Sequence, residues 1–303
     1  TDAEGNDAIY GSISFADGYR TLSIGSLSTV QNLHVGQAEY GATLNNATGA
    51  IYGNLFVAAG SGLTVNSDNI MANGRGTWEI AGPLKLGATT QTLAGNTLLL
   101  SGAAISGNTN AAGLVYTEDA TLRYTAINSI SANMNVAAGK TLTISAGRLN
   151  MDSLEISGNV SGSGDSVINL TGNGTVILSG ANTYTGAVTV EGLVTLQVAN
   201  TQALSHAMLN LEADGILLAD MAALGAPAEV GMLNLVASEP VTLDAETRTA
   251  GILQLHALAA TDVASAADAA YKVGGMSVRN AQTLDLLLSF GEGESLQTMK
   301  TYN

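Results

Sequence analysis

The sequence contains no cysteine in 303 residues. This absence excludes disulfide bonds, thiol nucleophiles and thiolate metal sites together. A chain that crosses an oxidising periplasm in an unfolded state has a reason to lack thiols. The composition is therefore compatible with export.

Basic residues are also scarce, with 10 Lys and Arg against 25 Asp and Glu and a formal net charge of −15. This charge repels phosphates and anionic lipids, so we expect no nucleic acid partner. No apolar run approaches the roughly 18 residues of a membrane-spanning helix, so we expect no direct membrane insertion of this chain.

Proline and aromatic residues are few, whereas glycine occurs 36 times. Charged residues make up only 12% of the chain, and 46% of the residues are hydrophobic. The bulk consists of Ala, Leu, Ser, Thr, Asn and Gly. This composition favours repetitive β-structure with a large core over a helical or α/β enzyme.

Short apolar segments flanked by Thr, Ser or Asn recur along the chain with a period of about 20 residues. They lie at 21–24, 63–65, 97–100, 121–124, 141–144, 175–178, 194–196, 208–211, 232–235 and 253–255. One segment, at 54–65, returns in close copy at 133–144, and the offset between the two copies is near four periods.

The period predicts an all-β fold, a parallel β-helix or β-solenoid in which each coil stacks on the previous one. Inward Leu, Val and Ile, among them Leu142 and Ile177, would form a continuous core. Antiparallel β-sandwich domains are the alternative, because they also combine short strands with frequent turns.

The pattern changes near residue 249. We therefore predict a β-helical repeat region over 1–248 and a C-terminal cap or second unit over 249–303. Within the second part, the Ala-rich segment 264–270 is typical of a short helix and 283–290 of a strand. A solenoid needs its open end covered, which favours the cap.

A family resemblance lies in the segment 174–190, Gly-Thr-Val-Ile-Leu-Ser-Gly-Ala-Asn-Thr-Tyr-Thr-Gly-Ala-Val-Thr-Val. It resembles the autotransporter-associated β-strand repeat of Gram-negative passenger regions, with departures at Ala187 and over 191–196. The resemblance implies a right-handed β-helical passenger that is secreted or displayed on the outer-membrane surface of a Gram-negative-type bacterium. It implies no single activity, since such passengers include adhesins, proteases and toxins.

An interval without any base runs from Arg148 to Arg248 and contains eleven acids. One interpretation is a solubilising surface. The other is an acidic face that binds cations or a basic partner, and its crowded carboxylates would respond to pH.

Motifs of common hydrolases are missing. The histidines at 34, 206 and 256 show no metal-ligand spacing, and neither His-Glu-x-x-His nor Gly-x-Ser-x-Gly occurs. The segment Gly164-Asp165-Ser166 is typical of a turn, although it also resembles half of a calcium-binding nonapeptide. We expect no cofactor, with calcium at this segment as the alternative.

Ala-Asp-Gly occurs twice, around Asp17 and around Asp214. Two aspartates that share a proton could activate water, as in aspartic peptidases, although the hydroxyl residue of the usual Asp-Thr-Gly signature is missing. Turns between coils are the alternative explanation. In a solenoid the two residues would lie many coils apart.

Aromatic residues gather in the N-terminal half, where their faces could stack on sugars. The candidates for binding are Tyr10, Tyr19, Tyr40, Tyr52 and Trp78.

Two function classes follow. The first is an exported, adhesin-like scaffold that binds an extracellular glycoprotein, glycan or other polysaccharide. The second is a carboxylate-dependent hydrolase, an acid-active aspartic-type peptidase or a glycan-cleaving enzyme that acts on mucin-type glycoprotein through Asp17 and Asp214.

Overall fold

The computed structural model describes most of the chain between residues 9 and 302. The described ranges are 9–15, 20–23, 29–35, 42–45, 50–51, 54–68, 76–147, 149–212, 215–220, 224, 228–236, 253–258, 271–273, 276–279, 284–290 and 297–302. The structure describes side-chain environments for residues 54–234 within these ranges apart from Asp220, and for Leu33 and Val35.

The longest sheet, here called sheet A, has 14 strands within the described residues. They are β1 (Ile9–Phe15), β3 (Thr29–Val35), β5 (Ala50–Ile51), β6 (Leu55–Val57), β8 (Thr77–Ile80), β11 (Thr97–Ser101), β14 (Ala120–Thr125), β17 (Thr141–Ala146), β20 (Val167–Thr171), β22 (Ala187–Val190), β24 (Leu204–Glu212), β26 (Ala228–Val236), β28 (Tyr271–Val273) and β29 (Met276–Arg279).

Two further sheets run beside sheet A. Among the described strands, sheet B contains β2 (Arg20–Ser23), β4 (Ala42–Asn45), β7 (Leu63–Val65), β9 (Pro83–Lys85), β12 (Ala104–Ser106), β15 (Ile127–Ile130), β18 (Ser153–Ile156), β21 (Thr175–Leu178), β23 (Thr195–Val198), β25 (Ile216–Asp220), β27 (Leu253–Leu258), β30 (Leu284–Phe290) and β31 (Gln297–Tyr302). Sheet C is short, with β10 (Thr90–Leu93), β13 (Gly113–Tyr116), β16 (Met134–Val136) and β19 (Val160–Gly162).

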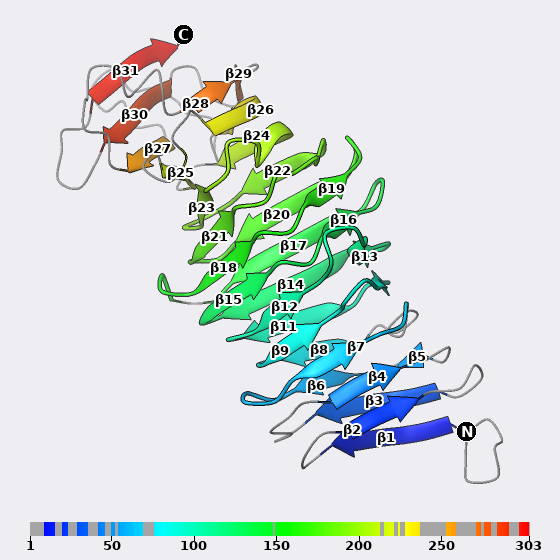
Figure 1. The fold of residues 1–303 in the computed structure, drawn as a ribbon. Coiled ribbons are helices and arrows are strands. Elements are labelled where there is room, and N and C mark those ends of the chain that lie inside the picture. The colour runs from blue at the N-terminus through cyan, green and yellow to red at the C-terminus, as the bar shows by residue number, and fades with distance from the viewer. Residues whose placement is uncertain are drawn as a thin grey trace.

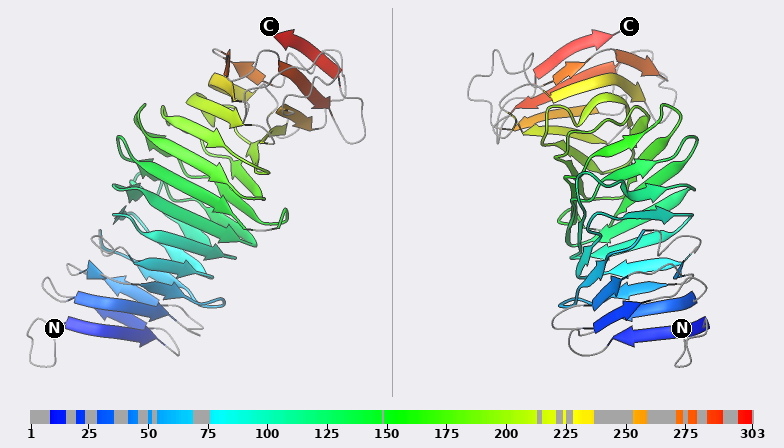
Figure 2. Two further views of the ribbon diagram at one scale, coloured as in Figure 1. Left: turned by 180° about the vertical axis from the view of Figure 1, so that it is seen from behind. Right: turned by 45° about the vertical axis from the view of Figure 1, so that its right-hand side comes forward.

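The strands stack as an elongated parallel β-solenoid, with β1 at one end and β31 at the other (Figure 1, Figure 2). Successive sheet A strands pair in parallel, as β11 does with β14 and β14 with β17. Within the described residues, antiparallel pairing is limited to β30 with β31. The β-helix prediction is confirmed, and the antiparallel sandwich is wrong because paired strands are joined by whole coils rather than by hairpins.

The coils vary in length. Val167 pairs with Ala187 and Thr141 pairs with Val167, so the coil that begins at Thr141 is longer than the one that follows it. The two close copies in the sequence occupy different sides of the solenoid, because 54–65 spans sheets A and B and 133–144 spans sheets C and A. Their offset is therefore not a whole number of coils. The repeated unit is a strand, a turn and a second strand, which fits more than one corner.

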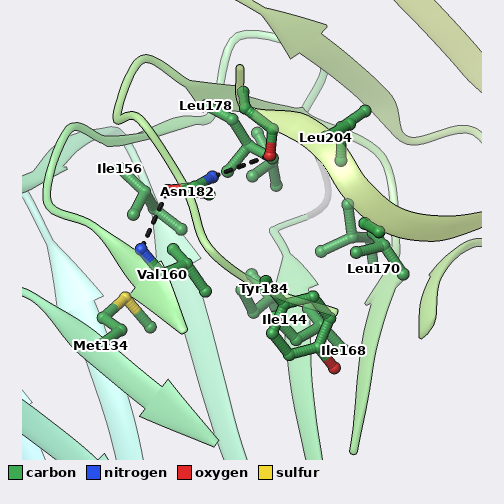
Figure 3. Close-up of a pocket in the computed structure, with 14 residues that line it drawn as sticks. Met134, Ile144, Ile156, Val160, Ile168, Leu170, Leu178, Asn182, Tyr184 and Leu204 are labelled. Carbon is green, nitrogen blue, oxygen red and sulfur yellow. Dashed lines mark hydrogen bonds between the residues drawn. The ribbon is translucent and has the colours of Figure 1, made fainter. Parts of the chain in front are cut away.

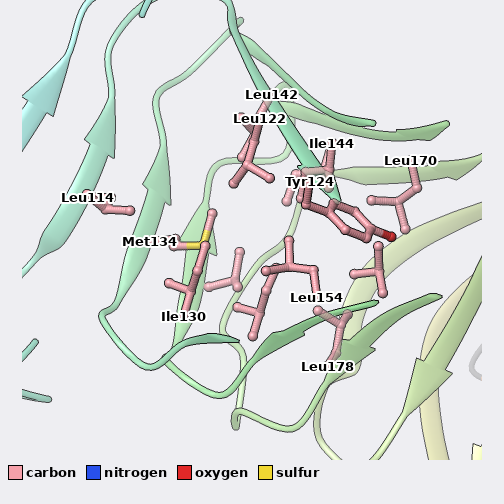
Figure 4. Packing of buried hydrophobic residues seen from close by; sticks show 14 of the residues in the cluster. Leu114, Leu122, Tyr124, Ile130, Met134, Leu142, Ile144, Leu154, Leu170 and Leu178 are labelled. Atoms are coloured by element: carbon pink, nitrogen blue, oxygen red, sulfur yellow. The ribbon is translucent and has the colours of Figure 1, made fainter. Parts of the chain in front are cut away.

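The interior is a continuous column of aliphatic side chains (Figure 4). Strands alternate between buried and partly exposed positions, which is the period of two that a pleated strand imposes. Leu142 lies in this core with 0% exposure, as expected. Ile177 does not, because it occupies an outward, partly exposed position on β21 between Glu155 and Gln197 of neighbouring strands.

A buried asparagine lies next to β19, the last described strand of sheet C, on the following coil. Asn182 is buried, accepts a hydrogen bond from the Val160 N–H at 2.9 Å and donates one to the Ala203 carbonyl at 3.1 Å (Figure 3). It therefore ties three successive coils together. Tyr184 is also buried beside it. These two residues belong to the segment that carries the family resemblance, and their role in the structure is to fill and satisfy the interior.

The C-terminal part continues the parallel stacking. Strand β27 pairs with β25, β30 pairs with β27, and β31 then closes the described end in antiparallel direction. The strand expected at 283–290 is confirmed as β30. The helix expected at 264–270 lies outside the described residues, and the division at residue 248 stays a prediction.

Candidate functional site

Four outward side chains lie in one row across sheet A. Phe56 on β6 is in register with Glu79 on β8, Glu79 with Leu99 on β11, and Leu99 with Arg123 on β14. Each residue lies between inward-facing neighbours on its own strand, so the pleat directs all four to the outer face. The row brings together residues that are far apart in the sequence.

These side chains line a depression of about 450 Å³. The other lining residues are Ile80, Ala81, Leu100, Ser101, Tyr124 and Thr125. This volume lies in the range of small-molecule and saccharide sites. We call the depression the sheet A groove.

Across three neighbouring strands, the groove presents an acid, then an aliphatic residue, then a base. Adjacent strands lie about 4.8 Å apart, so the Cα atoms of Glu79 and Arg123 are separated by about 10 Å. Both side chains are exposed, and in the described structure they form no salt bridge with each other. Their hydrogen-bonding groups are therefore available to a ligand that lies over Leu99.

The floor of the groove is held by the core beneath it. The Tyr124 ring is 1% exposed, and its hydroxyl donates a hydrogen bond to the Thr175 carbonyl at 3.0 Å, two coils away along the rod. Burial, together with the charge of Asp152, raises the pKa of Tyr124. The hydroxyl therefore stays protonated and keeps this bond at any physiological pH.

A second, hydroxyl-rich depression of about 360 Å³ lies on the same sheet, near the beginnings of the strands. Thr97, Thr121 and Thr143 occupy one outward row in register, and Thr141 and Asp119 lie beside them. Asp119 accepts a hydrogen bond from the Thr141 N–H at 2.8 Å, so its carboxylate is partly committed to the turn. This surface offers hydroxyl groups beside a single carboxylate.

The row of threonines belongs to a longer polar ladder. In register from β8 to β26 it contains Thr77, Thr97, Thr121, Thr143, Asn169, Thr189, Asn210 and Asn234. Where contacts are close, the amides bond along the ladder, since the Asn234 amide donates to Asn210 Oδ1 at 2.9 Å and the Asn210 amide donates to Thr189 Oγ1 at 3.3 Å. The ladder therefore stabilises the stacking of coils.

Of the five aromatic residues predicted to bind sugars, only Trp78 has a side chain that the structure describes, and Trp78 does not line this groove. Trp78 is on β8 but points inward and is 1% exposed, so its indole fills the core and presents no face to a ligand. This position corrects its assignment as a binding residue. Tyr10 is on β1, and the structure does not describe its side chain. Tyr19, Tyr40 and Tyr52 lie outside the described residues.

Asp17 and Asp214, the pair of the hydrolase alternative, also lie outside the described residues, so that alternative stays a hypothesis. Among the described residues, no group of three or more His, Asp or Glu is arranged to hold a metal ion. The Asp165 carboxylate accepts a hydrogen bond from the Ser163 hydroxyl, and this bond lowers the pKa of Asp165. The segment thus has the geometry of a turn.

One pair of acids stands out in the interval without bases. Glu212 ends β24, and Glu191 follows β22, the neighbouring strand. Partial burial raises the pKa of Glu212, and the negative charge of Glu191 raises it further. Like charges on adjacent coils therefore repel here, as the sequence interval suggested.

A small cavity of about 20 Å³ lies inside the solenoid between Met134, Tyr184 and Leu204 (Figure 3). Its lining is almost entirely apolar. A space of this size holds at most one or two waters, and an apolar lining gives water few partners. It is a packing defect rather than a ligand site.

Sequence reasoning missed the groove because its residues are unremarkable one by one. A signal was present, since each contributing strand from β8 to β14 contains Thr, an inward residue and then the groove residue, as in Thr77-Trp78-Glu79. Aligning these triplets would have placed Glu79, Leu99 and Arg123 in one row.

In the part of the chain that the structure describes, no helix is long and apolar enough to cross a membrane.

No family model matches the sequence, and neither the curated proteins nor the solved structures include a match. The structure itself assigns the chain to the all-β class, as a parallel β-solenoid repeat protein.

Proposed function

We propose that the chain is a binding scaffold, exported and displayed outside the cell, that holds a glycan or glycoprotein in the sheet A groove. The observation that carries the proposal is the row of Phe56, Glu79, Leu99 and Arg123 on a rigid parallel sheet. Saccharides are bound through aromatic or aliphatic contact with ring faces and through charged side chains that bond to hydroxyl pairs. The groove combines both kinds of contact.

The rod supports this role mechanically. The coils that carry the groove are joined to their neighbours through sheet A, as β11 is to β14 and β14 to β17, so an outward residue keeps its position relative to residues one and two coils away. Preorganised contacts lose little entropy when a ligand binds. The resemblance of segment 174–190 to autotransporter-associated repeats favours an exported passenger, secreted or displayed on a Gram-negative-type outer membrane.

The proposal is tested by retention of the purified chain on immobilised mucin. Arg123→Gln should weaken retention, because it removes the guanidinium that would bond to ligand oxygens. Lys85→Gln is the matched control, since Lys85 is an exposed base on β9 of sheet B and its loss changes the net charge equally. Equal retention of the two variants, or no retention of the parent chain, would contradict the proposal.

The same experiment separates binding from turnover. The parent chain is incubated with mucin and with casein from about pH 4 to about pH 8, and the products are examined for fragments. Binding without fragments supports the scaffold. Fragments that form at acid pH, and that disappear in Asp17→Asn and Asp214→Asn, would replace it by the hydrolase.

A further inference from the structure

The sheet A groove differs from a general sugar site in having an aliphatic side chain at its centre. Leu99 lies between Glu79 and Arg123 in the outward row and is partly exposed. A sugar that carries only hydroxyl groups would place some of them over this side chain, where they lose water and gain no hydrogen bond. The centre of the groove therefore favours a ligand with a small apolar group.

The two ends of the groove define the polar part of that ligand. Glu79 accepts hydrogen bonds and Arg123 donates them. A trans amide has its N–H and its C=O directed to opposite sides, so it can donate to Glu79 and accept from Arg123 at the same time. The methyl of an acetamido group attached to a sugar would then lie over Leu99.

Charge selects against acidic ligands. The chain carries a net charge of −15, and the groove adds one acid and one base, which cancel. A polyanionic glycan would be repelled at long range without a local excess of positive charge to compensate. A neutral ligand meets no such barrier.

We infer that the sheet A groove selects a neutral glycan through a 2-acetamido sugar, whose amide bridges Glu79 and Arg123 and whose methyl contacts Leu99. Phe56 lies next to Glu79 on the side away from Leu99, where its half-buried ring can contact the adjoining sugar. This inference rests on the proposed function and names the ligand class of the same groove.

The test uses matched pairs of sugars that differ only at carbon 2. Binding of the full chain is measured by calorimetry or ligand-observed NMR with triacetylchitotriose against cellotriose, and with methyl N-acetylgalactosaminide against methyl galactoside. We expect the acetamido member of at least one pair to bind about tenfold more tightly than its hydroxyl partner. Trigalacturonic acid, an acidic oligosaccharide without an acetamido group, serves as the acidic probe and should bind no better than the hydroxyl sugars.

Two variants connect the selectivity to the groove. Leu99→Thr should reduce the ratio of affinities between the acetamido sugar and its hydroxyl partner to about twofold or less, because the contact between Leu99 and the ligand methyl is lost. Val115→Thr is its control, since Val115 is a partly exposed position on β13 of sheet C, and it should leave the ratio unchanged. Thermal unfolding of each variant shows that the fold persists.

The outcomes separate this inference from the proposed function. Three results would overturn the acetamido inference and leave the scaffold standing, provided that the chain is still retained on mucin. They are equal affinity within both pairs, preference for trigalacturonic acid, and no binding of any small probe. A preference that survives Leu99→Thr would overturn the role of Leu99. Absence of both mucin retention and sugar binding would overturn both.

Discussion

The Asp152 carboxylate accepts a hydrogen bond from the backbone N–H of Ala126, one coil earlier, at 2.7 Å. Ala126 has a φ of 62°, in the left-handed region that residues with a Cβ rarely adopt. Asp152 is buried at 5% exposure, and its other carboxylate oxygen lies 3.4 Å from the Leu149 N–H. A buried acid thus fixes a strained corner between sheets A and B.

Asp152→Ala should therefore destabilise the protein by about 2 kcal/mol, because it leaves a backbone N–H without its acceptor at a strained residue. Ala126→Gly should have the opposite effect, a gain of about 0.5 kcal/mol, since glycine adopts this φ without strain. Urea unfolding of the two variants and of the double variant measures both effects. Additive effects in the double variant would show that the two residues are not coupled.

Gly113→Ala should destabilise the protein by about 3 kcal/mol. Gly113 has a φ of 67°, and a Cβ at this position would overlap the backbone of Asn133 in the next coil. Gly102, with a φ of 74° and open space around its Cβ position, is the matched control. Gly102→Ala should cost only the backbone strain, about 1 kcal/mol, so equal losses in the two variants would exclude close coil contact as the cause.

A charge placed inside the solenoid should have a far larger effect than the same charge outside. Leu142→Asp should cost about 4 kcal/mol or more, because the new carboxylate is buried without a partner. Ile177→Asp should cost less than about 1 kcal/mol, since its position is partly exposed, although the new acid lies beside Glu155. Thermal melts of both variants compare the two positions directly. A larger loss of stability in Ile177→Asp than in Leu142→Asp would show that the inward and outward faces assigned to β17 and β21 are wrong.

Stability should rise when the pH falls below neutral. The pKa of Glu212 is raised above its ordinary value of 4.5, so the folded state binds this proton more tightly than the unfolded state. The resulting stabilisation is complete below the unfolded pKa and is lost as the pH rises through the folded pKa. Glu212→Gln should reduce the dependence of stability on pH in this range and raise the thermal midpoint at neutral pH.

The control for this effect is Glu155→Gln. Glu155 lies on sheet B and accepts a hydrogen bond from the Ser179 hydroxyl at 2.7 Å. Its in-register neighbours on the adjacent coils are the uncharged Ser129 and Ile177. Melting curves from about pH 4 to about pH 8 should show flattening in Glu212→Gln alone. The same flattening in Glu155→Gln would indicate a general response of the acidic interval.

The sequence determined the class of fold because the relevant signals are local. Alternating strands such as Thr141–Ala146, separated by glycine turns and repeated at a nearly regular spacing, favour stacked coils whatever the distant contacts are. The C-terminal strand over 284–290 could be predicted on the same grounds. Local pattern also identified Leu142 as a core residue.

Tertiary structure decided what depends on register. A shift of one residue turns a side chain from the core to the surface, which is why Ile177 faces outward between the inward Val176 and Leu178 although all three are apolar. Register also decides which residues meet across coils of unequal length. Glu79, Leu99 and Arg123 share a groove although the coil from Leu99 to Arg123 is longer than the coil from Glu79 to Leu99, and no pattern within a single strand contains that relationship.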